Sequence, residues 1–463
     1  MTTLEQFDRQ TIRLIVLRRE GSQILLTSSE AGWLLPSVSA SPRKRIAEQV
    51  AAELNEVRGW KVYCLFFLNF QAPNRSNYAV LESITRDGKA AKGTCWISCK
   101  PPMCQPTQSV EDNCAIKEAL RQLDSRSHRS QAGPLGRLGW LEDLFIWAQE
   151  QLTPLGLQVN RTFQQFNAGP AFSLIRLETN GPAFWFKATG EPNFHELSIT
   201  ATLTRLFPGN LPAILGVHLS WNGWLSEEVS RATLDEFIEV FIWERVASDL
   251  AELQIASIGR DAELLRAGCK DMRFSNLLDL IDPFFARMAD FMAAQEKKAP
   301  PPLTNSELSL VASRLKESCS LLHDLRFPET LGHIDLNPGN VLISPGRIAF
   351  IDWAEGCVTN PLVTFEYLLE HARRCHIPGT AATERITAAY LRPWRAVLSP
   401  TDLARGMAVS SLVAVFAYAV AGKAWLSPET LQDSSRSGYL RSLTRRMYRE
   451  ATQASRRSEQ CVA

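Results

Sequence analysis

Residues 10–85 contain short apolar runs rich in Val, Ile, Leu and aromatic residues, together with one stretch of helical periodicity. The runs predict strands, and the stretch from Ile46 to Val57 predicts a helix. The pattern indicates a small α+β domain at residues 1–123, called the front domain below. Its strands are expected over residues 11–19, 22–28, 61–70 and 78–84.

Residues 124–139, DSRSHRSQAGPLGRLG, are rich in Ser, Gly and Arg and show no apolar period. Such a composition is typical of a linker. We therefore expect a domain boundary in this segment.

The chain after the linker changes from strand patterns to helix patterns. A helix is predicted over residues 140–152, and Thr179-Asn180-Gly181 marks a hairpin turn between two strands. Strand patterns occur at residues 159–166, 171–178, 183–188 and 221–229. Since the pattern beyond Thr233 is helical, we expect a small sheet-rich lobe at residues 140–230 and a larger helical lobe at residues 231–463.

The overall composition excludes several classes of protein. Fifty Lys and Arg stand against 49 Asp and Glu, so no global charge attracts nucleic acid or an anionic membrane. The N-terminus lacks the pattern of an export signal, and the apolar run Met407–Ala421 is shorter than the roughly 20 residues that a bilayer requires. We therefore expect a cytoplasmic protein with its cysteines as thiols, in which this run is a buried helix.

The stretch from Leu331 to Gly356 carries the strongest chemical signal. Two short strands flank Pro345-Gly346, a pair suited to a type II turn. Counting outward from this turn places Asn340 opposite Ile351, so Asn340 and Asp352 should lie at the same end of the ribbon. Their amide and carboxylate oxygens are hard ligands that suit Mg²⁺.

Asp335 lies five residues before Asn340, in a loop that contains Pro338 and Gly339. A carboxylate in this position can accept the proton of an attacking hydroxyl while a metal ion neutralises a phosphoryl group. The alternative is that His333, Asp335 and Asn340 only cap turns, which polar residues beside Pro-Gly often do.

The pattern His333-x-Asp335-x-x-x-x-Asn340 followed by Asp352 resembles the aminoglycoside phosphotransferase and choline kinase family. The resemblance implies a two-lobed protein kinase-like fold, ATP or GTP as phosphoryl donor and Mg²⁺ as cofactor. It makes Asp335 the catalytic base, Asn340 and Asp352 the metal ligands, and His333 the residue that orders the loop.

The same resemblance extends to the preceding lobe. Lys187 would contact the donor phosphates, Glu196 would pair with this lysine, and residues 167–173 would cover the phosphates. Residues 224–229, which include Glu228 and Val229, would form the hinge whose backbone binds the base. An edge strand is the alternative for residues 224–229.

The sequence departs from the family after Asp352. The family usually carries a Gly-Asp-Pro-like turn and then an aspartate that braces the catalytic loop, whereas this chain has Thr359-Asn360-Pro361 and Thr364. Bracing by Asn360 or Glu366 is one way to fill this role, and a slow or specialised site is another.

The front domain has the outline of a Nudix box, a helix and loop whose glutamates bind metal for pyrophosphate hydrolysis. Glu53, Glu56 and Gly59-Trp60 match this pattern. Four other positions of the box are altered, and the loss of carboxylates should impair metal binding. We expect a catalytically silent Nudix-like domain, with an unrelated amphipathic helix as the alternative. The altered positions are Val38, Lys44, Ala52 and Val57.

Cysteines 95, 99, 104 and 114 cluster in the front domain, but their spacing differs from the paired knuckles of structural zinc sites. We therefore interpret them as core or loop thiols.

Together these patterns predict an α+β protein that acts as an ATP- and Mg²⁺-dependent phosphotransferase on a hydroxyl of a small molecule, without nucleic acid or membrane partners. A pseudokinase or a metabolite sensor that binds nucleotide without turnover is the alternative, and a genuine Nudix hydrolase with a kinase-like appendage is a third. The acceptor, the choice of ATP or GTP and the oligomeric state are not readable from the sequence.

Overall fold

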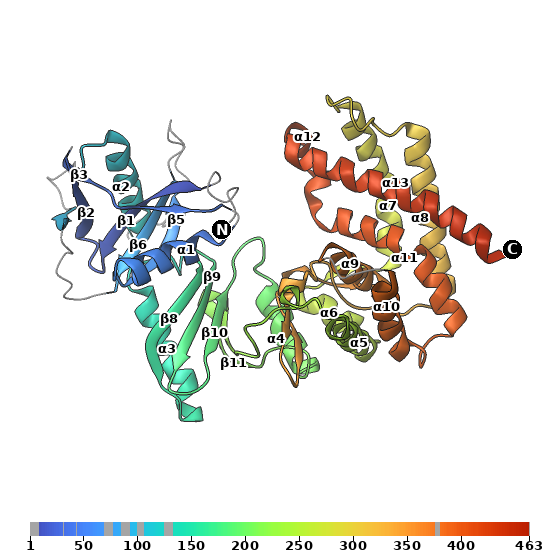
Figure 1. Cartoon of the computed structure of the whole chain (residues 1–463), viewed down its shortest axis with the longest axis horizontal. Coiled ribbons are helices and arrows are strands. Elements are labelled where there is room, and N and C mark those ends of the chain that lie inside the picture. The colour runs from blue at the N-terminus through green and yellow to red at the C-terminus, as the bar shows by residue number, and fades with distance from the viewer. Residues whose placement is uncertain are drawn as a thin grey trace. The chain divides into compact units, whose positions relative to one another are not determined.

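The computed structural model describes residues 9–30, 32–42, 44–68, 77–84, 93–99, 106–124, 133–375 and 380–462. The chain forms two compact units (Figure 1). The first unit comprises Met1–Leu197 and Ala213–Glu228, and the second comprises Ser198–Pro212 and Val229–Ala463.

The front domain contains a mixed sheet in the order β3-β2-β1-β6-β5, with β4 paired to β1 and β7 paired to β2. Strands β1 and β6 are parallel, whereas β5 runs antiparallel to β6. The strands are β1 (Gln10–Arg18), β2 (Gln23–Ser29), β3 (Gly32–Leu34), β4 (Ser37–Ala40), β5 (Val62–Leu68), β6 (Asn77–Ser83) and β7 (Thr94–Ser98).

Two helices accompany this sheet. Helix α1 (Ile46–Ala52) continues into a π-helical turn, Glu53–Val57, in which Arg58 N–H donates to Glu53 O. Helix α2 (Val110–Leu123) is capped by Ser109, whose hydroxyl accepts the Asp112 N–H. The predicted helix over residues 46–57 is therefore present, but its second half has the wider π geometry.

The second sheet of the first unit is antiparallel, in the order β11-β12-β10-β9-β8. Helix α3 (Trp140–Leu152) precedes it, and α4 (Glu196–Leu206) follows β10. The strands are β8 (Val159–Asn167), β9 (Ser173–Thr179), β10 (Phe184–Ala188), β11 (Ile214–His218) and β12 (Gly223–Glu227).

Both sheets of the first unit contribute to one hydrophobic core. Tyr63 of β5, Trp140 of α3 and Phe186 of β10 are buried in the same cluster. The Trp140 ring lies 5.6 Å from that of Tyr63 and 5.7 Å from that of Phe186. Leu135, in the described part of the expected linker, is also buried there. Burial of a large apolar side chain contributes about 1.5–3 kcal/mol to the free energy of unfolding. The shared core therefore stabilises the packing of the front domain against the second sheet.

The second unit is mainly helical and encloses two small sheets. One sheet has the order β13-β17-β14, and the other is the β15-β16 ribbon. Its strands are β13 (Lys270–Met272), β14 (Thr330–His333), β15 (Val341–Ile343), β16 (Ile348–Phe350) and β17 (Gly356–Thr359). Its helices are α5 (Val240–Ala256), α6 (Asp261–Ala267), α7 (Phe274–Ala293), α8 (Asn305–Asp324), α9 (Pro361–Arg374), α10 (Thr380–Trp394), α11 (Pro400–Ala421), α12 (Glu429–Gln432) and α13 (Ser434–Val462).

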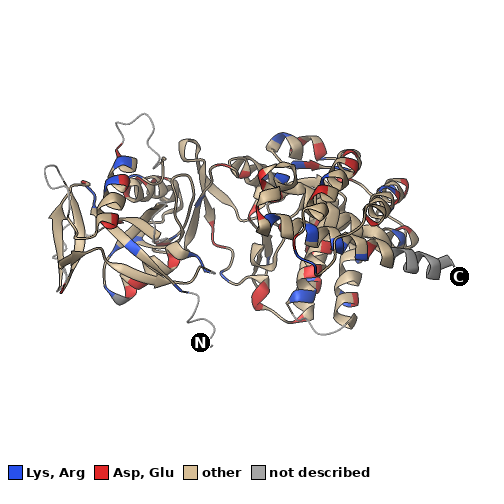
Figure 2. Cartoon of the chain, turned by 90° about the horizontal axis from the view of Figure 1, so that it is seen from above, with Lys and Arg blue, Asp and Glu red and all other residues tan. Residues whose placement is uncertain are grey.

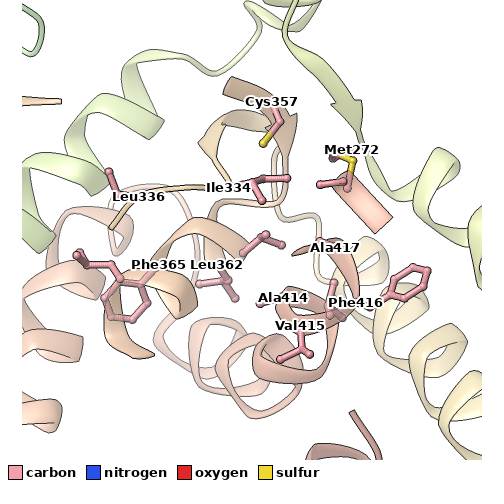
Figure 3. Close-up of a cluster of buried hydrophobic side chains, with 14 of the residues drawn as sticks. Met272, Ile334, Leu336, Cys357, Leu362, Phe365, Ala414, Val415, Phe416 and Ala417 are labelled. Carbon is pink, nitrogen blue, oxygen red and sulfur yellow. The ribbon is translucent and has the colours of Figure 1, made fainter. Parts of the chain in front are cut away.

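Helix α11 contains the apolar run that was expected to be a buried helix. It is long and apolar enough to cross a membrane by length and composition, and 56% of its most apolar window is buried within the protein. Val415 and Phe416 are buried in the core of the second unit, where Leu362 and Phe365 of α9 are also found (Figure 3). This packing agrees with the predicted buried helix.

The predicted α+β class is confirmed, and most elements lie where the sequence patterns placed them. The described elements that were not predicted are helix α2 and strands β3, β4, β7, β11, β13, β14 and β17. Lys and Arg are interspersed with Asp and Glu over both units, as the near-zero net charge suggests (Figure 2).

Candidate active site

The β15-β16 ribbon has the register that the Pro345-Gly346 turn predicted. Val341 pairs with Phe350, and Ile351 N–H donates to Asn340 O over 3.0 Å. Asn340 therefore lies opposite Ile351, and Asp352 follows at the same end of the ribbon. This part of the sequence prediction is confirmed.

The Asn340 side chain has a defined orientation. Its Nδ2 donates to the backbone oxygen of Asp335 over 2.9 Å, and the residue is 8% exposed. Since the nitrogen end is engaged with the loop, the oxygen Oδ1 is the end available to a cation. The chemistry of this atom fits a hard metal ligand.

Asp352 adopts a left-handed backbone conformation, with φ of 67° and ψ of 51°. Such a conformation costs a non-glycine residue about 1–3 kcal/mol and persists only where its surroundings impose it. Here Ile351 is fixed by its N–H to Asn340 O and by the 3.1 Å contact of its carbonyl with His333 Nε2. The backbone conformation of Asp352 is therefore set by its neighbours in the ribbon and the loop.

His333 connects the loop to the ribbon. Its Nδ1 accepts the Asp335 N–H over 3.2 Å, which makes Nε2 the protonated nitrogen that donates to Ile351 O. Burial lowers the pKa of His333, so the imidazole is neutral at physiological pH. These contacts are what a loop-ordering residue requires.

Thr364 braces the loop, a role the sequence analysis left to Asn360 or Glu366. The buried Thr364 Oγ1 accepts the His333 N–H over 2.9 Å. Asn360 instead caps α9 by accepting the Leu362 N–H, and Glu366 accepts a hydrogen bond from Ser410 on α11. A hydroxyl at the position where the family carries an aspartate thus makes a backbone contact to the loop.

Tyr367 is a candidate site residue that the sequence analysis missed. Its hydroxyl lies 3.4 Å from Asp335 Oδ1, and burial raises the pKa of this tyrosine, so it remains a donor. The ring stacks on Tyr418 with a centroid distance of 5.3 Å, and the Tyr439 hydroxyl donates to that of Tyr418 over 2.9 Å. The only sequence signal was that Tyr367 follows Thr364 by three residues on α9 and so shares its face.

A cavity of about 640 Å³ lies beside the loop. Ile334 and Asp335 line it, together with Glu355, which forms an ion pair with Lys270. The remaining lining residues come from the region of α11 to α13 and include Tyr418, Ala421, Arg436, Tyr439 and Leu443. Asp335 thus faces a space large enough for a small molecule.

Lys187 and Glu196 form the ion pair that was predicted in the first unit. The Lys187 Nζ lies 2.5 Å from Glu196 Oε1, and the two side chains are 19% and 1% exposed. Lys187 also lies over the ring of Trp224, its partner in the β10-β12 register. A buried carboxylate of this kind is stable only with its cation, so the pair fixes the position of the ammonium group.

Glu228 has a structural partner in the first unit. It pairs with Arg176, which raises the pKa of the guanidinium, and accepts a hydrogen bond from Trp185 Nε1 over 2.9 Å. Strand β12 lies between β11 and β10, so the alternative of an edge strand is wrong. Glu228 and Val229 follow β12 where the chain leaves the first unit, and their role as a base-binding hinge stays a prediction.

Residues 242–400 match the model of the phosphotransferase enzyme family. The predicted resemblance is confirmed. The matched segment contains Asp335, Asn340, Asp352 and Thr364, whereas Lys187 and the front domain lie outside it. About a third of the chain thus matches a family of phosphotransferases, and this third includes the proposed catalytic segment.

Three of the solved structures that are similar to this chain are two kinases of amino alcohols and one macrolide phosphotransferase. Choline kinase LicA from Streptococcus pneumoniae is 15% identical, with 67% of this chain and 98% of that chain covered and a TM-score of 0.41. An ethanolamine kinase from Plasmodium vivax is 15% identical, with 67% and 88% covered and a TM-score of 0.42. The macrolide 2'-phosphotransferase MphH from Brachybacterium faecium is 15% identical, with 65% and 98% covered and a TM-score of 0.40. No curated protein matches the sequence.

The two glutamates that match the Nudix box have no metal-binding surroundings among the described residues. Glu53 lies in the π-helical turn with Oε1 3.9 Å from Arg58 Nε, and Glu56 is exposed. Within the described residues, no three His, Cys, Asp or Glu side chains are grouped to hold a metal ion. The Nudix-like assignment is not confirmed, and a silent domain stays a prediction.

The cysteine cluster is described only in part. Cys95 and Cys99 are half-buried and Cys114 is exposed, while Cys104 lies outside the described residues. Burial raises the pKa of Cys99 to about 11, so this thiol is protonated at neutral pH.

Proposed function

We propose that this phosphotransferase moves the terminal phosphoryl group of ATP or GTP to a hydroxyl of a small molecule, with Asp335 as the base. The observation that carries the proposal is the hydrogen-bonded network of the 331–356 segment. Asn340 donates to Asp335 O, while His333 contacts both the Asp335 N–H and Ile351 O. These bonds tie the loop that carries Asp335 to Asn340 and to Ile351, the residue before Asp352.

The residues present fit a divalent cation. Asn340 Oδ1 and the Asp352 carboxylate would hold Mg²⁺, and two protein oxygens are typical for an ion that also binds phosphate oxygens and water. When bound, the ion would neutralise negative charge on the transferring phosphoryl group. In the first unit, Lys187 would contact the donor phosphates, with Glu196 fixing its position.

The acceptor would occupy the cavity beside Asp335. Its hydroxyl would donate to an Asp335 carboxylate oxygen, with Tyr367 holding the other face of the carboxyl group. As the hydroxyl oxygen bonds to the terminal phosphorus, its proton passes to Asp335, the bond to the donor's bridging oxygen breaks, and the nucleoside diphosphate leaves. The tyrosine rings, Glu355 and Arg436 make the cavity suited to a polar, hydroxylated molecule.

The test is a screen of hydroxylated metabolites, amino alcohols, macrolides and aminoglycosides with ATP or GTP and Mg²⁺, following release of the nucleoside diphosphate. We expect turnover with at least one acceptor and its loss in Asp335→Asn. Nucleotide binding without turnover for any acceptor would favour the sensor over the enzyme. Equal turnover by the variant would exclude Asp335 as the base.

The cytoplasmic location expected from the sequence also remains part of the proposal. Cys64, Cys269, Cys319 and Cys357 are buried in the core as free thiols, a state that a reducing compartment preserves. Cell fractionation with an antibody to the full chain tests this location.

A further inference from the structure

The buried side chain of Gln165 joins the two sheets of the first unit. Gln165 of β8 is 1% exposed, and its carboxamide bonds both backbone groups of Cys64 on β5. The Cys64 N–H donates to Gln165 Oε1 over 2.9 Å, and Gln165 Nε2 donates to Cys64 O over 2.7 Å. Strands β5 and β8 each end the order of their sheet, so the glutamine bridges two strand edges.

The strand after β8 has its own contact with the front domain. The Tyr63 hydroxyl lies 3.3 Å from the Ser173 hydroxyl at the start of β9, and Ser173 is fully buried. The Tyr63 ring also lies 6.2 Å from that of Phe163 on β8. Both strands of the β8-β9 hairpin are therefore attached to residues next to each other on β5.

The tip of this hairpin, residues 168–172, contacts both the front domain and the segment before α3. Ala168 packs against the core of the front domain, and the Leu135 N–H donates to Pro170 O over 3.1 Å. A Cβ at Gly133 would lie 2.4 Å from Pro170 O, so the chain before α3 approaches the tip as only glycine can.

The other side of the tip faces the segment that leads to the lysine pair. A Cβ at Gly190 would lie 2.3 Å from the Ala171 Cβ, which shows how closely the tip packs on this segment. In the β9-β10 register, Leu174 lies opposite Lys187 and Ser173 opposite Ala188. The hairpin tip is thus adjacent to the strand end that carries Lys187.

We propose that the front domain acts as a fixed support for the β8-β9 hairpin and that Gln165 is a positioning residue for donor binding. The proposal rests on the proposed function, in which residues 167–173 cover the donor phosphates. A mobile phosphate-covering loop must be ordered when nucleotide binds, and prior attachment lowers that entropic cost. The front domain would serve the reaction in this way without any chemistry of its own.

The chain offers a matched pair of substitutions. Gln165→Leu removes both hydrogen bonds to Cys64, whereas Gln164→Leu makes the same change one residue earlier at an exposed position of the same strand. Binding of Mg-ATP and Mg-GTP to the full chain is measured by calorimetry, and KM and kcat are measured with an acceptor from the screen. We expect Gln165→Leu to weaken nucleotide binding about tenfold, since each lost bond leaves a buried backbone group unpaired. Gln164→Leu should bind within about twofold of wild type.

The KM and kcat values separate positioning from a general loss of structure. A positioning role raises the KM for the nucleotide and leaves the KM for the acceptor unchanged. A fall in kcat with an unchanged nucleotide KM would mean only that less protein is folded, and it would overturn the proposal. Nucleotide affinity equal to wild type in a folded Gln165→Leu would also overturn it.

Gln165→Met provides a second test if the leucine variant does not fold. Its unbranched side chain is close to glutamine in length and removes both hydrogen bonds to Cys64 without burying a charge, so we again expect nucleotide binding to weaken about tenfold. Affinity equal to wild type in this variant would count against the proposal. If the wild-type protein binds no Mg-nucleotide at all, the proposed function itself fails, and this inference fails with it.

Discussion

The 331–356 segment of the second unit and the helical stretch 46–57 of the front domain both carry acidic residues at suggestive spacings. In the 331–356 segment, Asp335, Asn340 and His333 are joined by hydrogen bonds to one another or to adjacent backbone. In the front domain, Glu56 is exposed, and Glu53 has an ion-pair contact at 3.9 Å with Arg58.

The difference shows what separates a spacing match from a site. The His333 and Asn340 side chains are buried and hydrogen-bonded to the loop and the ribbon, so their donor and acceptor atoms have set positions. The front-domain glutamates have no such support, and their stretch changes from α to π geometry at Glu53. The spacing of polar residues in a sequence identifies candidate sites, and the contacts that hold their side chains show which candidates are sites.

The largest expected effect compares the two regions directly. Asp335→Asn removes the proposed base, and we expect kcat to fall by about a thousandfold, within the range for general base catalysis. The double variant Glu53→Gln with Glu56→Gln should leave kcat within about twofold of wild type. Steady-state release of the nucleoside diphosphate measures both. A comparable loss in the double variant would restore a chemical role to the front domain.

Removal of the Thr364 hydroxyl, which accepts the His333 N–H, should have the next largest effect on kcat. Thr364→Val keeps the shape of the side chain but leaves the buried His333 N–H without its acceptor. The loss should lower the free energy of unfolding by about 1–3 kcal/mol. We expect a lower midpoint of denaturant unfolding and a kcat reduced about tenfold, because the neighbouring loop loses its fixed position. Thr364→Ser keeps the hydroxyl and is the control. Equal activity of the valine and serine variants would show that the hydroxyl does not support the loop.

A smaller effect is expected at Tyr367. Tyr367→Phe keeps the ring stack on Tyr418 but removes the hydroxyl 3.4 Å from Asp335 Oδ1. For a bond of this length we expect kcat to fall by about threefold, with the nucleotide KM unchanged. Tyr448→Phe on α13 removes a hydroxyl that does not contact the loop and should have no effect. A raised acceptor KM at unchanged kcat would place the Tyr367 hydroxyl in acceptor binding instead.

The smallest effect on activity is expected at Glu329, a carboxyl group of the same unit outside the proposed chemistry. Burial raises its pKa to about 7, although Glu329 Oε1 accepts the Phe274 N–H. The folded protein holds the Glu329 proton more tightly than the unfolded chain does. The free energy of unfolding is therefore highest below pH 4.5, and this stabilisation is lost as the pH rises through 7. Glu329→Gln should therefore match wild type near pH 5 and exceed its unfolding free energy by about 2 kcal/mol at pH 8. A stability difference that does not change with pH would contradict this assignment.

Features that depend on neighbours in the chain were predictable. The β15-β16 register followed from Pro345-Gly346, and α3 was predicted with its bounds because its apolar period and the preceding glycines are local signals. The place of Asp335, Asn340 and Asp352 around this ribbon could be predicted for the same reason. Strand β11 was missed, because its pattern is short and partly exposed.

The contacts that support the site were decided by tertiary structure. Thr364 meets the His333 N–H across 31 residues, Tyr367 meets Asp335 across 32, and Gln165 meets Cys64 across 101. A threonine, a tyrosine and a glutamine are ordinary in a sequence, and each acquires its role only from the group that folding places beside it. Local periodicity determines elements and short turns, whereas the pairing of buried polar groups depends on which distant segments the core brings together.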